Sequence, residues 1–218
     1  MNNLNYLTKI IPCLLLLSSL LLSGCVSKPN INLLPVNVTN PEQAKSWEMQ
    51  GKLAVKTTED KFSTNLYWLH TEYNNELRLT TMLGTTVMSL TSDANGAELV
   101  LDGKTYRDED PELLLKRLTG WSIPIDILPL WITGQISATD QVLSRDQANR
   151  PQTVQSHIGQ TPWQVTFKSW QTQSGAQLPR LLELTREDIR LKIQISQWQA
   201  LTDSVTLSPE TPEKSNEQ

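Results

Sequence analysis

The feature that most restricts how this chain can fold is a two-residue alternation of apolar and polar side chains. It is clearest in residues 189–195, where aliphatic side chains occupy every second position and Arg, Lys or Gln stands between them. The same alternation recurs in shorter runs at residues 51–56, 62–68, 77–80, 87–91 and 98–101. Turn signals at residues 93–96 and 102–103 follow two of these runs. Such alternation predicts antiparallel strands with one covered face.

A helical period interrupts the strands once. Asp110 suits an N-cap, Pro111 the first helical position and Gly120 the C-terminal end, with Leu113, Leu114 and Leu118 as the apolar stripe. A second short helix is expected over residues 124–133. Further strands are predicted at residues 138–143, 152–158, 163–167 and 181–186, with a polar loop at 171–176. About ten or eleven strands and one helical pair indicate an α+β fold, in which a curved antiparallel sheet has a concave face that one or two helices can cap.

The N-terminus carries a motif of its own. Residues 10–22 are apolar, follow Lys9, and lead into Leu-Ser-Gly-Cys at 22–25. A basic start, a short apolar middle and small residues are typical of a secretory signal peptide, and the run is shorter than the roughly 20 residues of a membrane span. The last four residues fit a bacterial lipobox, so we expect residues 1–24 to be removed and Cys25 to be acylated. The alternative is an ordinary signal peptide that happens to contain a Cys.

Lipidation has consequences for location. The mature chain would lie outside the cytoplasm and be held to a membrane by lipid. In bacteria with two membranes, Asp after the acylated Cys tends to mean inner-membrane retention, and Val26 stands there instead. By this resemblance we expect the outer membrane, on its periplasmic face. No disulfide is expected in the mature chain, because Cys13 leaves with the signal peptide and Cys25 carries lipid.

The rest of the chain divides into three parts. Residues 25–46 contain three prolines and no sustained period, and we interpret them as a lipidated tether. Residues 47–201 are long enough for one domain. Residues 202–218 are rich in Pro and acidic side chains and are predicted to be a disordered acidic tail.

Catalytic chemistry is missing from the sequence. His70 and His157 are the only histidines, stand in no metal-ligand spacing, and are expected at the surface. The acidic run 108–110 precedes a predicted helix, so capping and dipole stabilisation explain it. There is no Gly-rich phosphate loop, and a net charge of -4 without a basic stripe argues against nucleic acid. We therefore predict no enzyme, no catalytic residue, no metal and no cofactor.

Several stretches together resemble one family. They are Trp47 with residues 51–55 and 62–68, then residues 77–86, 118–124 and 130–134, with weaker support from 178–180 and 189–198. In this order, behind a lipobox, they are similar to the LolB family of outer-membrane lipoprotein acceptors in the lipoprotein-localisation pathway. The resemblance implies a half-open antiparallel β-barrel with helices as a lid over an apolar cavity.

The resemblance also implies a function. A family member takes an acylated lipoprotein from a LolA-like periplasmic carrier and delivers it to the inner leaflet of the outer membrane, without nucleotide. We expect it to act as a monomer. The carrier docking surface and the identity of the cargo lipoproteins are not encoded in any motif we recognise.

A cavity for acyl chains would be lined by apolar side chains of the strands and the lid. The inward strand positions are Val55, Leu66, Trp68, Leu77, Leu79, Val165, Leu182, Leu184 and Ile193, and the lid would add Trp121, Trp131 and Ile132. The same side chains equally suit a solid core, because alternation does not separate a packed sheet from a hollow one.

Leu83 is the sharpest candidate site. It stands between Met82 and Gly84, at the junction of two predicted strands. In the family a Leu in this place protrudes from its loop and contacts the membrane during insertion; the family usually has Pro where Met82 stands. The alternative is a Leu folded back under a hairpin.

Seven Trp residues against two Phe keep a second function open. The chain could be a structural or polysaccharide-binding outer-membrane lipoprotein that uses exposed Trp rings as sugar platforms. That reading predicts exposed rings, whereas lipoprotein transfer predicts rings that face inward. A periplasmic hydrolase is disfavoured by the missing acid–base set.

Overall fold

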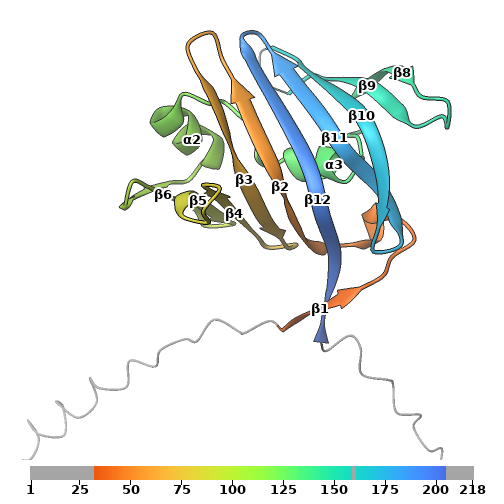
Figure 1. Cartoon of the computed structure of the whole chain (residues 1–218), viewed down its shortest axis with the longest axis horizontal. Helices are drawn as coiled ribbons and strands as arrows, with labels where there is room; N and C mark the ends of the chain where they lie inside the picture. Colours follow the sequence, from red (N-terminus) through yellow and green to blue (C-terminus); the bar gives the residue numbers. More distant parts are fainter. Residues whose placement is uncertain (1–31, 159–160, 205–218) are drawn as a thin grey trace, which may run out of the picture. The chain divides into compact units, whose positions relative to one another are not determined.

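The structure, a computed structural model, describes residues 32–158 and 161–204. Within them, twelve strands form one sheet (Figure 1). The strands are β1 (Leu33–Val36), β2 (Ser46–Lys56), β3 (Lys61–His70), β4 (Asn74–Thr80), β5 (Thr86–Asp93), β6 (Gly96–Leu101), β7 (Lys104–Asp108), β8 (Gln141–Arg145), β9 (Pro151–Ser156), β10 (Trp163–Gln173), β11 (Ala176–Arg186) and β12 (Ile189–Asp203).

The sheet is an antiparallel meander in which β12 makes two long-range pairings, one with β2 and one with β1. Its order is β7-β6-β5-β4-β3-β2-β12-β11-β10-β9-β8, so β12 returns to pair with β2 and joins the two halves of the chain. β7 and β8 form the two edges and do not pair with each other. The curved sheet therefore stays open, which confirms the predicted antiparallel half-barrel.

The two faces of the sheet follow the predicted alternation. In β12 the side chains of Ile189, Leu191 and Ile193 are buried, whereas Arg190 and Lys192 are exposed. The register carries this pattern across the sheet, because each inward residue pairs with inward residues on both sides. Ile193, for example, lies between Leu53 of β2 and Leu182 of β11.

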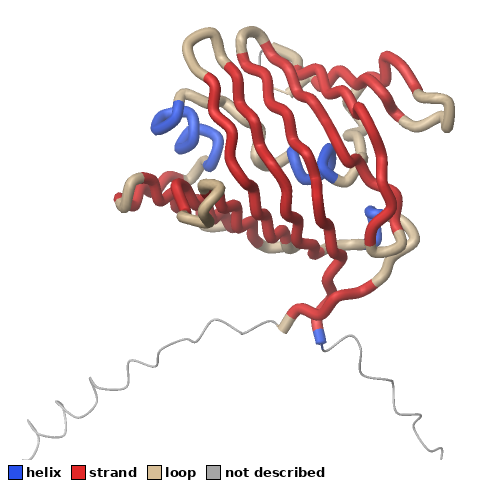
Figure 2. Tube along the Cα trace, in the orientation of Figure 1, coloured by secondary structure: helices blue, strands red, loops and turns tan. Residues whose placement is uncertain are grey.

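Two α-helices lie on the concave face (Figure 2). α2 (Pro111–Thr119) begins as predicted, with the Asp110 carboxylate accepting from two backbone N–H groups, and it ends at Gly120 in a left-handed conformation. α3 (Leu128–Ile132) is shorter than predicted. Proline lacks an N–H and fits only the first turn of a helix, so Pro129 sets the start of α3 at Leu128.

The predicted tether is wrong over residues 33–36, whereas a short helical turn was expected near Pro41. Leu33–Val36 form β1, which pairs with Ala200–Asp203, and Pro41–Gln43 form a 3-10 helix with a capping box at Asn40. β1 was missed because a four-residue strand shows no period of its own. β12 continues to Asp203, past the predicted domain end at residue 201. Residues 25–31 of the tether and 205–218 of the acidic tail lie outside the described residues.

Two other strand assignments also differ. Residues 171–176 are not a polar loop, because β10 and β11 continue through them and turn only at Ser174 and Gly175. β7 was missed because its side chains are nearly all polar, and Tyr106 is its one hydrophobic side chain packed against the core. An edge strand with little buried surface has no apolar period to detect.

Candidate functional site

A small apolar cavity lies between one half of the concave face and the helical segment, which we define as residues 111–132 with both α-helices. Its volume is about 30 Å³, close to the share of one water molecule in the liquid. Strands β2–β5 and β12 form the floor with Leu53, Leu66, Trp68, Leu77, Leu79, Met88, Leu90, Leu191 and Ile193. The helical segment contributes Leu115, Trp121, Ile123, Ile125 and Leu128. All lining side chains are hydrophobic, so the cavity suits hydrocarbon and not a polar ligand.

Half of the predicted cavity residues line this space. They are Leu66, Trp68, Leu77, Leu79, Trp121 and Ile193. The others are buried in the core outside it: Val55, Trp131, Ile132, Val165, Leu182 and Leu184. Contact of any of these residues with an acyl chain stays a prediction.

Sequence reasoning also missed lining residues. Met88 and Leu90 lie opposite Leu79 and Leu77 in the register, and the alternation of β5 could have identified them. In α2 the buried leucines are Leu114 and Leu115, whereas Leu113, predicted to face the core, is 55% exposed. A nine-residue helix offers only about two turns from which to fix its apolar face.

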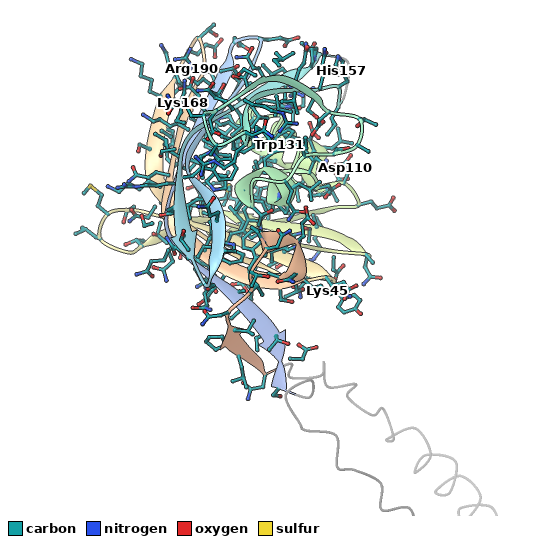
Figure 3. All side chains as sticks on the ribbon, turned by 90° about the vertical axis from the view of Figure 1, so that its right-hand side faces the viewer. Lys45, Asp110, Trp131, His157, Lys168 and Arg190 are labelled. Atoms are coloured by element: carbon teal, nitrogen blue, oxygen red, sulfur yellow. The ribbon has the colours of Figure 1, made fainter. Side chains whose placement is uncertain are left out.

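The other half of the concave face is a packed core. Trp131 of α3 and Trp163 of β10 are both fully buried, and their ring centroids lie 6.5 Å apart. Figure 3 shows Trp131 on the concave side of the sheet. The inner face is therefore neither wholly filled nor wholly hollow: large rings occupy the α3 side, and the cavity lies towards β4 and β5.

One arginine ties the helical segment to the sheet. The Nη2 of Arg186, in β11, donates to the Ser122 backbone oxygen at 2.6 Å, and its guanidinium lies 4.5 Å from the centroid of the Trp163 ring. Ser122 Oγ donates in turn to Glu112 Oε1 at 2.6 Å. The Trp121 ring packs on Phe62 of β3, with centroids 5.4 Å apart. These contacts hold residues 120–127 across the cavity.

The loop of residues 81–85 presents its apolar tip to solvent. Met82 is 90% exposed and Leu83 is 95% exposed. The Thr81 N–H donates to Thr85 O at 2.8 Å, and the Gly84 N–H to Thr81 O at 3.0 Å. Gly84 has φ +86°, a conformation that other residues rarely adopt. Leu83 is therefore not folded under the hairpin; what it contacts remains a prediction.

The titratable groups serve structural purposes. His70 is half-buried rather than at the surface: its ring packs on Trp47, and Nδ1 lies 2.8 Å from Asn75 Oδ1. Burial lowers the pKa of His70. His157 is exposed as expected. In the acidic run, Asp110 caps α2 and Asp108 pairs with Arg117 at 2.8 Å.

Within residues 32–158 and 161–204, no group of three or more His, Cys, Asp or Glu side chains could hold a metal ion. No helix there has the length and apolar character to cross a membrane. Cys25, the predicted acylation site, lies outside the described residues.

Fold and site together define a class: open antiparallel half-barrels with short helices over an apolar interior. The model of the family "Outer membrane lipoprotein LolB" matches residues 45–198. The Outer-membrane lipoprotein LolB of Shewanella loihica is 58% identical, over 97% of this chain and 98% of that relative. The relative of the same name from Shewanella sediminis is also 58% identical, over 98% of both. The chain belongs to the LolB family.

Solved structures give a more distant likeness. A LolA superfamily protein of Nitrosomonas europaea aligns with a TM-score of 0.47 at 9% identity, over 72% of this chain and 86% of that one. A putative outer membrane lipoprotein-sorting protein domain from Vibrio parahaemolyticus has a TM-score of 0.43 at 12% identity, over 78% and 96%.

Proposed function

We propose that the chain is an outer-membrane-anchored lipoprotein acceptor. It takes an acylated lipoprotein from a LolA-like periplasmic carrier into its apolar cavity and inserts it into the inner leaflet of the outer membrane, without nucleotide. It is held on the periplasmic face by lipid on Cys25 and works as a monomer. The observation that carries this proposal is the cavity with exclusively hydrophobic side chains beneath the helical segment.

The physical need for such a cavity follows from the cargo. Each methylene of an acyl chain gains about 0.8 kcal/mol on leaving water, so a lipoprotein with several chains does not cross the periplasm exposed. Binding to a hydrophobic wall removes that cost. An acceptor protein needs only to offer an apolar surface close to a membrane, because transfer of the acyl chains from the protein into the bilayer lowers the free energy.

The cavity has to widen before it can hold an acyl chain. At about 30 Å³ it has room for roughly one water. In this proposal the helical segment is the lid. α2 is suited to moving, because only Leu114 and Leu115 of its nine residues are buried. Displacing α2 and residues 120–127 would expose the apolar floor of β3–β5 to an entering chain.

The 81–85 loop contacts the membrane when the lipoprotein is inserted. Burying one Leu side chain in the membrane yields about 1.5–3 kcal/mol. Leu83 and Met82 together would hold the protein against the leaflet briefly, without anchoring it. Their exposure, together with the short hydrogen-bonded turn beneath them, supports such a transient contact.

The alternative function, polysaccharide binding, requires exposed Trp rings that the structure does not offer. Five of the seven Trp residues are buried, namely Trp47, Trp68, Trp131, Trp163 and Trp198. The remaining two, Trp121 and Trp170, are half-buried and packed against the core. A sugar platform requires an accessible ring face, so the placement of these rings favours the acceptor.

Photo-cross-linking tests the cavity directly. The acylated protein, in phospholipid vesicles, would receive from the carrier a lipoprotein whose acyl chain ends in a diazirine. We expect cross-links to peptides that contain the lining residues of β3–β5 and residues 121–128, followed by loss of these cross-links as cargo enters the vesicle. Cross-links confined to the outer face, or none despite transfer, would rule out the cavity as the binding site.

A further inference from the structure

We propose that the outer, convex face of the sheet lies on the phospholipid headgroups of the membrane, with its cations against lipid phosphates. We call this surface the basic outer face and define it by Lys52, Lys56, Lys61, Arg78, Arg190 and Lys192, on β2, β3, β4 and β12. All six side chains are exposed. The inference goes beyond cargo binding and rests on two parts of the proposed function, the lipid anchor at Cys25 and the membrane contact of the 81–85 loop.

The register gathers like charges in one row of this face, whereas Lys192 lies opposite Glu183 of β11. Lys56 lies directly opposite Arg190 on one side and Lys61 on the other, so three cations stand in one cross-strand row. Like charges opposed across a sheet are destabilising. Of the five ion pairs among the described residues, only the pair of Arg78 with Glu76 involves this face. The row is therefore left for an external anion to neutralise.

The face carries a hollow of mixed polar and apolar lining, in two adjoining parts. One part, about 490 Å³, is lined by Lys52, Arg78 and Thr80, and the next, about 340 Å³, by Pro35 and Glu48. Gln50 and Gln197 line both parts. Gly51 lines the first part, at a point where the backbone of β12 passes so close that a Cβ would overlap the Gln194 carbonyl oxygen.

Both ends of the hollow adjoin points expected to touch the bilayer. At one end, Thr80 immediately precedes the loop that exposes Met82 and Leu83. At the other, Pro35 belongs to β1, which begins eight residues after Cys25. Eight residues span at most about 28 Å, so lipid on Cys25 keeps β1 close to the membrane. A bilayer that meets both ends also faces the surface between them.

The side views agree with this orientation. In Figure 3 Lys168 and Arg190 lie on the convex side of the sheet, away from Trp131 on the concave side. A convex surface meets a flat bilayer along its central strands. Those strands are β2 and β12, which carry four of the six cations. The six cations are spread over four strands. The many phosphates of a leaflet can neutralise all of them at once, whereas a single bound anion can reach only a few.

The test uses the acylated protein in vesicles and a single new thiol. The sequence has two Cys, Cys13 in the predicted signal peptide and Cys25, so a fluorophore on Gln194→Cys reports the outer face alone. A fluorophore on Lys116→Cys, in α2, is the matched reporter on the concave side. With a headgroup-attached quencher in phosphatidylethanolamine–phosphatidylglycerol vesicles, we expect several-fold stronger quenching at position 194 than at 116. Equal quenching of the two would overturn the proposal.

Charge reversal tests the cause of the contact. Each cation near an anionic leaflet contributes about fivefold in binding, so Lys56→Glu with Lys192→Glu should weaken contact of position 194 at least tenfold. The matched control, Lys104→Glu with Lys116→Glu, should leave it unchanged. If the first pair leaves quenching unchanged but slows transfer from the carrier, the face binds protein and the proposal is wrong. Cross-linking of cargo in the cavity should be unaffected throughout, which separates this proposal from the acceptor function.

Discussion

Replacing Arg186 by Met should loosen the helical segment without unfolding the sheet. Arg186 is the polar link from β11 to Ser122, and through Ser122 to Glu112 of α2. Methionine keeps much of the aliphatic stem that packs in this region but has no donor and no charge. Residues 120–127 would keep their apolar contacts and lose their hydrogen bond to the sheet.

The size of the effect follows from two interactions. A hydrogen bond from a charged donor is worth about 1.5–3 kcal/mol net, and a cation–π contact about 0.5–2 kcal/mol. Arg186 is half-buried, so solvent screening favours the lower ends of both ranges. Together they stabilise the closed position by about 2 kcal/mol. Their loss should raise the open population about 30-fold.

An apolar fluorescent dye that brightens in hydrophobic sites would measure the open population. We expect Arg186→Met to bind the dye more strongly and to load an acylated peptide faster than the unaltered protein. Arg180→Met is the control, because Arg180 is exposed on the same strand. If the two variants bind dye and peptide alike while circular dichroism shows both folded, then Arg186 does not hold the cavity closed.

Three further changes probe the tip of the 81–85 loop, the half-buried His70 and the close backbone approach at Gly51. Leu83→Glu should leave folding and cargo loading intact, since the side chain is 95% exposed, but should block release into vesicles; a normal insertion rate would contradict this. Because burial lowers the pKa of His70 below 6.5 in the folded state, the unfolded chain takes up the proton first as pH falls, so stability is lost below about pH 6.5. The melting temperature of His70→Gln should therefore fall less between pH 7.5 and pH 5 than that of the unaltered protein, and equal falls would refute the assignment. Gly51→Ala should lower stability by about 1–3 kcal/mol, since its Cβ overlaps the Gln194 carbonyl oxygen, whereas Gln50→Ala should have little effect; unchanged melting of Gly51→Ala would contradict the packing.

Local sequence patterns were enough to predict a strand or helix when its own residues show the period or the capping residues of that element. The alternation in β12 predicts which side chains lie on each face of the sheet. Asp110 and Gly120 predict where α2 begins and ends. Elements stabilised by distant partners give no such signal. β1 exists because Ala200–Asp203 offers it a hydrogen-bonding edge, and β7 because β6 does. Neither pairing leaves a trace in the four or five residues that form the strand.

The sequence by itself determined that this chain is an antiparallel sheet with one covered face and that Leu83 stands at a strand junction, and it predicts a lipobox at residues 22–25. It determined these because periodicity, turns and the lipobox are properties of neighbours in the chain. Only the tertiary structure decided which inward side chains surround the cavity and which fill the core beside Trp131 and Trp163. That division depends on where the helical segment crosses the sheet, and the crossing is set by contacts between residues far apart, such as Arg186 with Ser122.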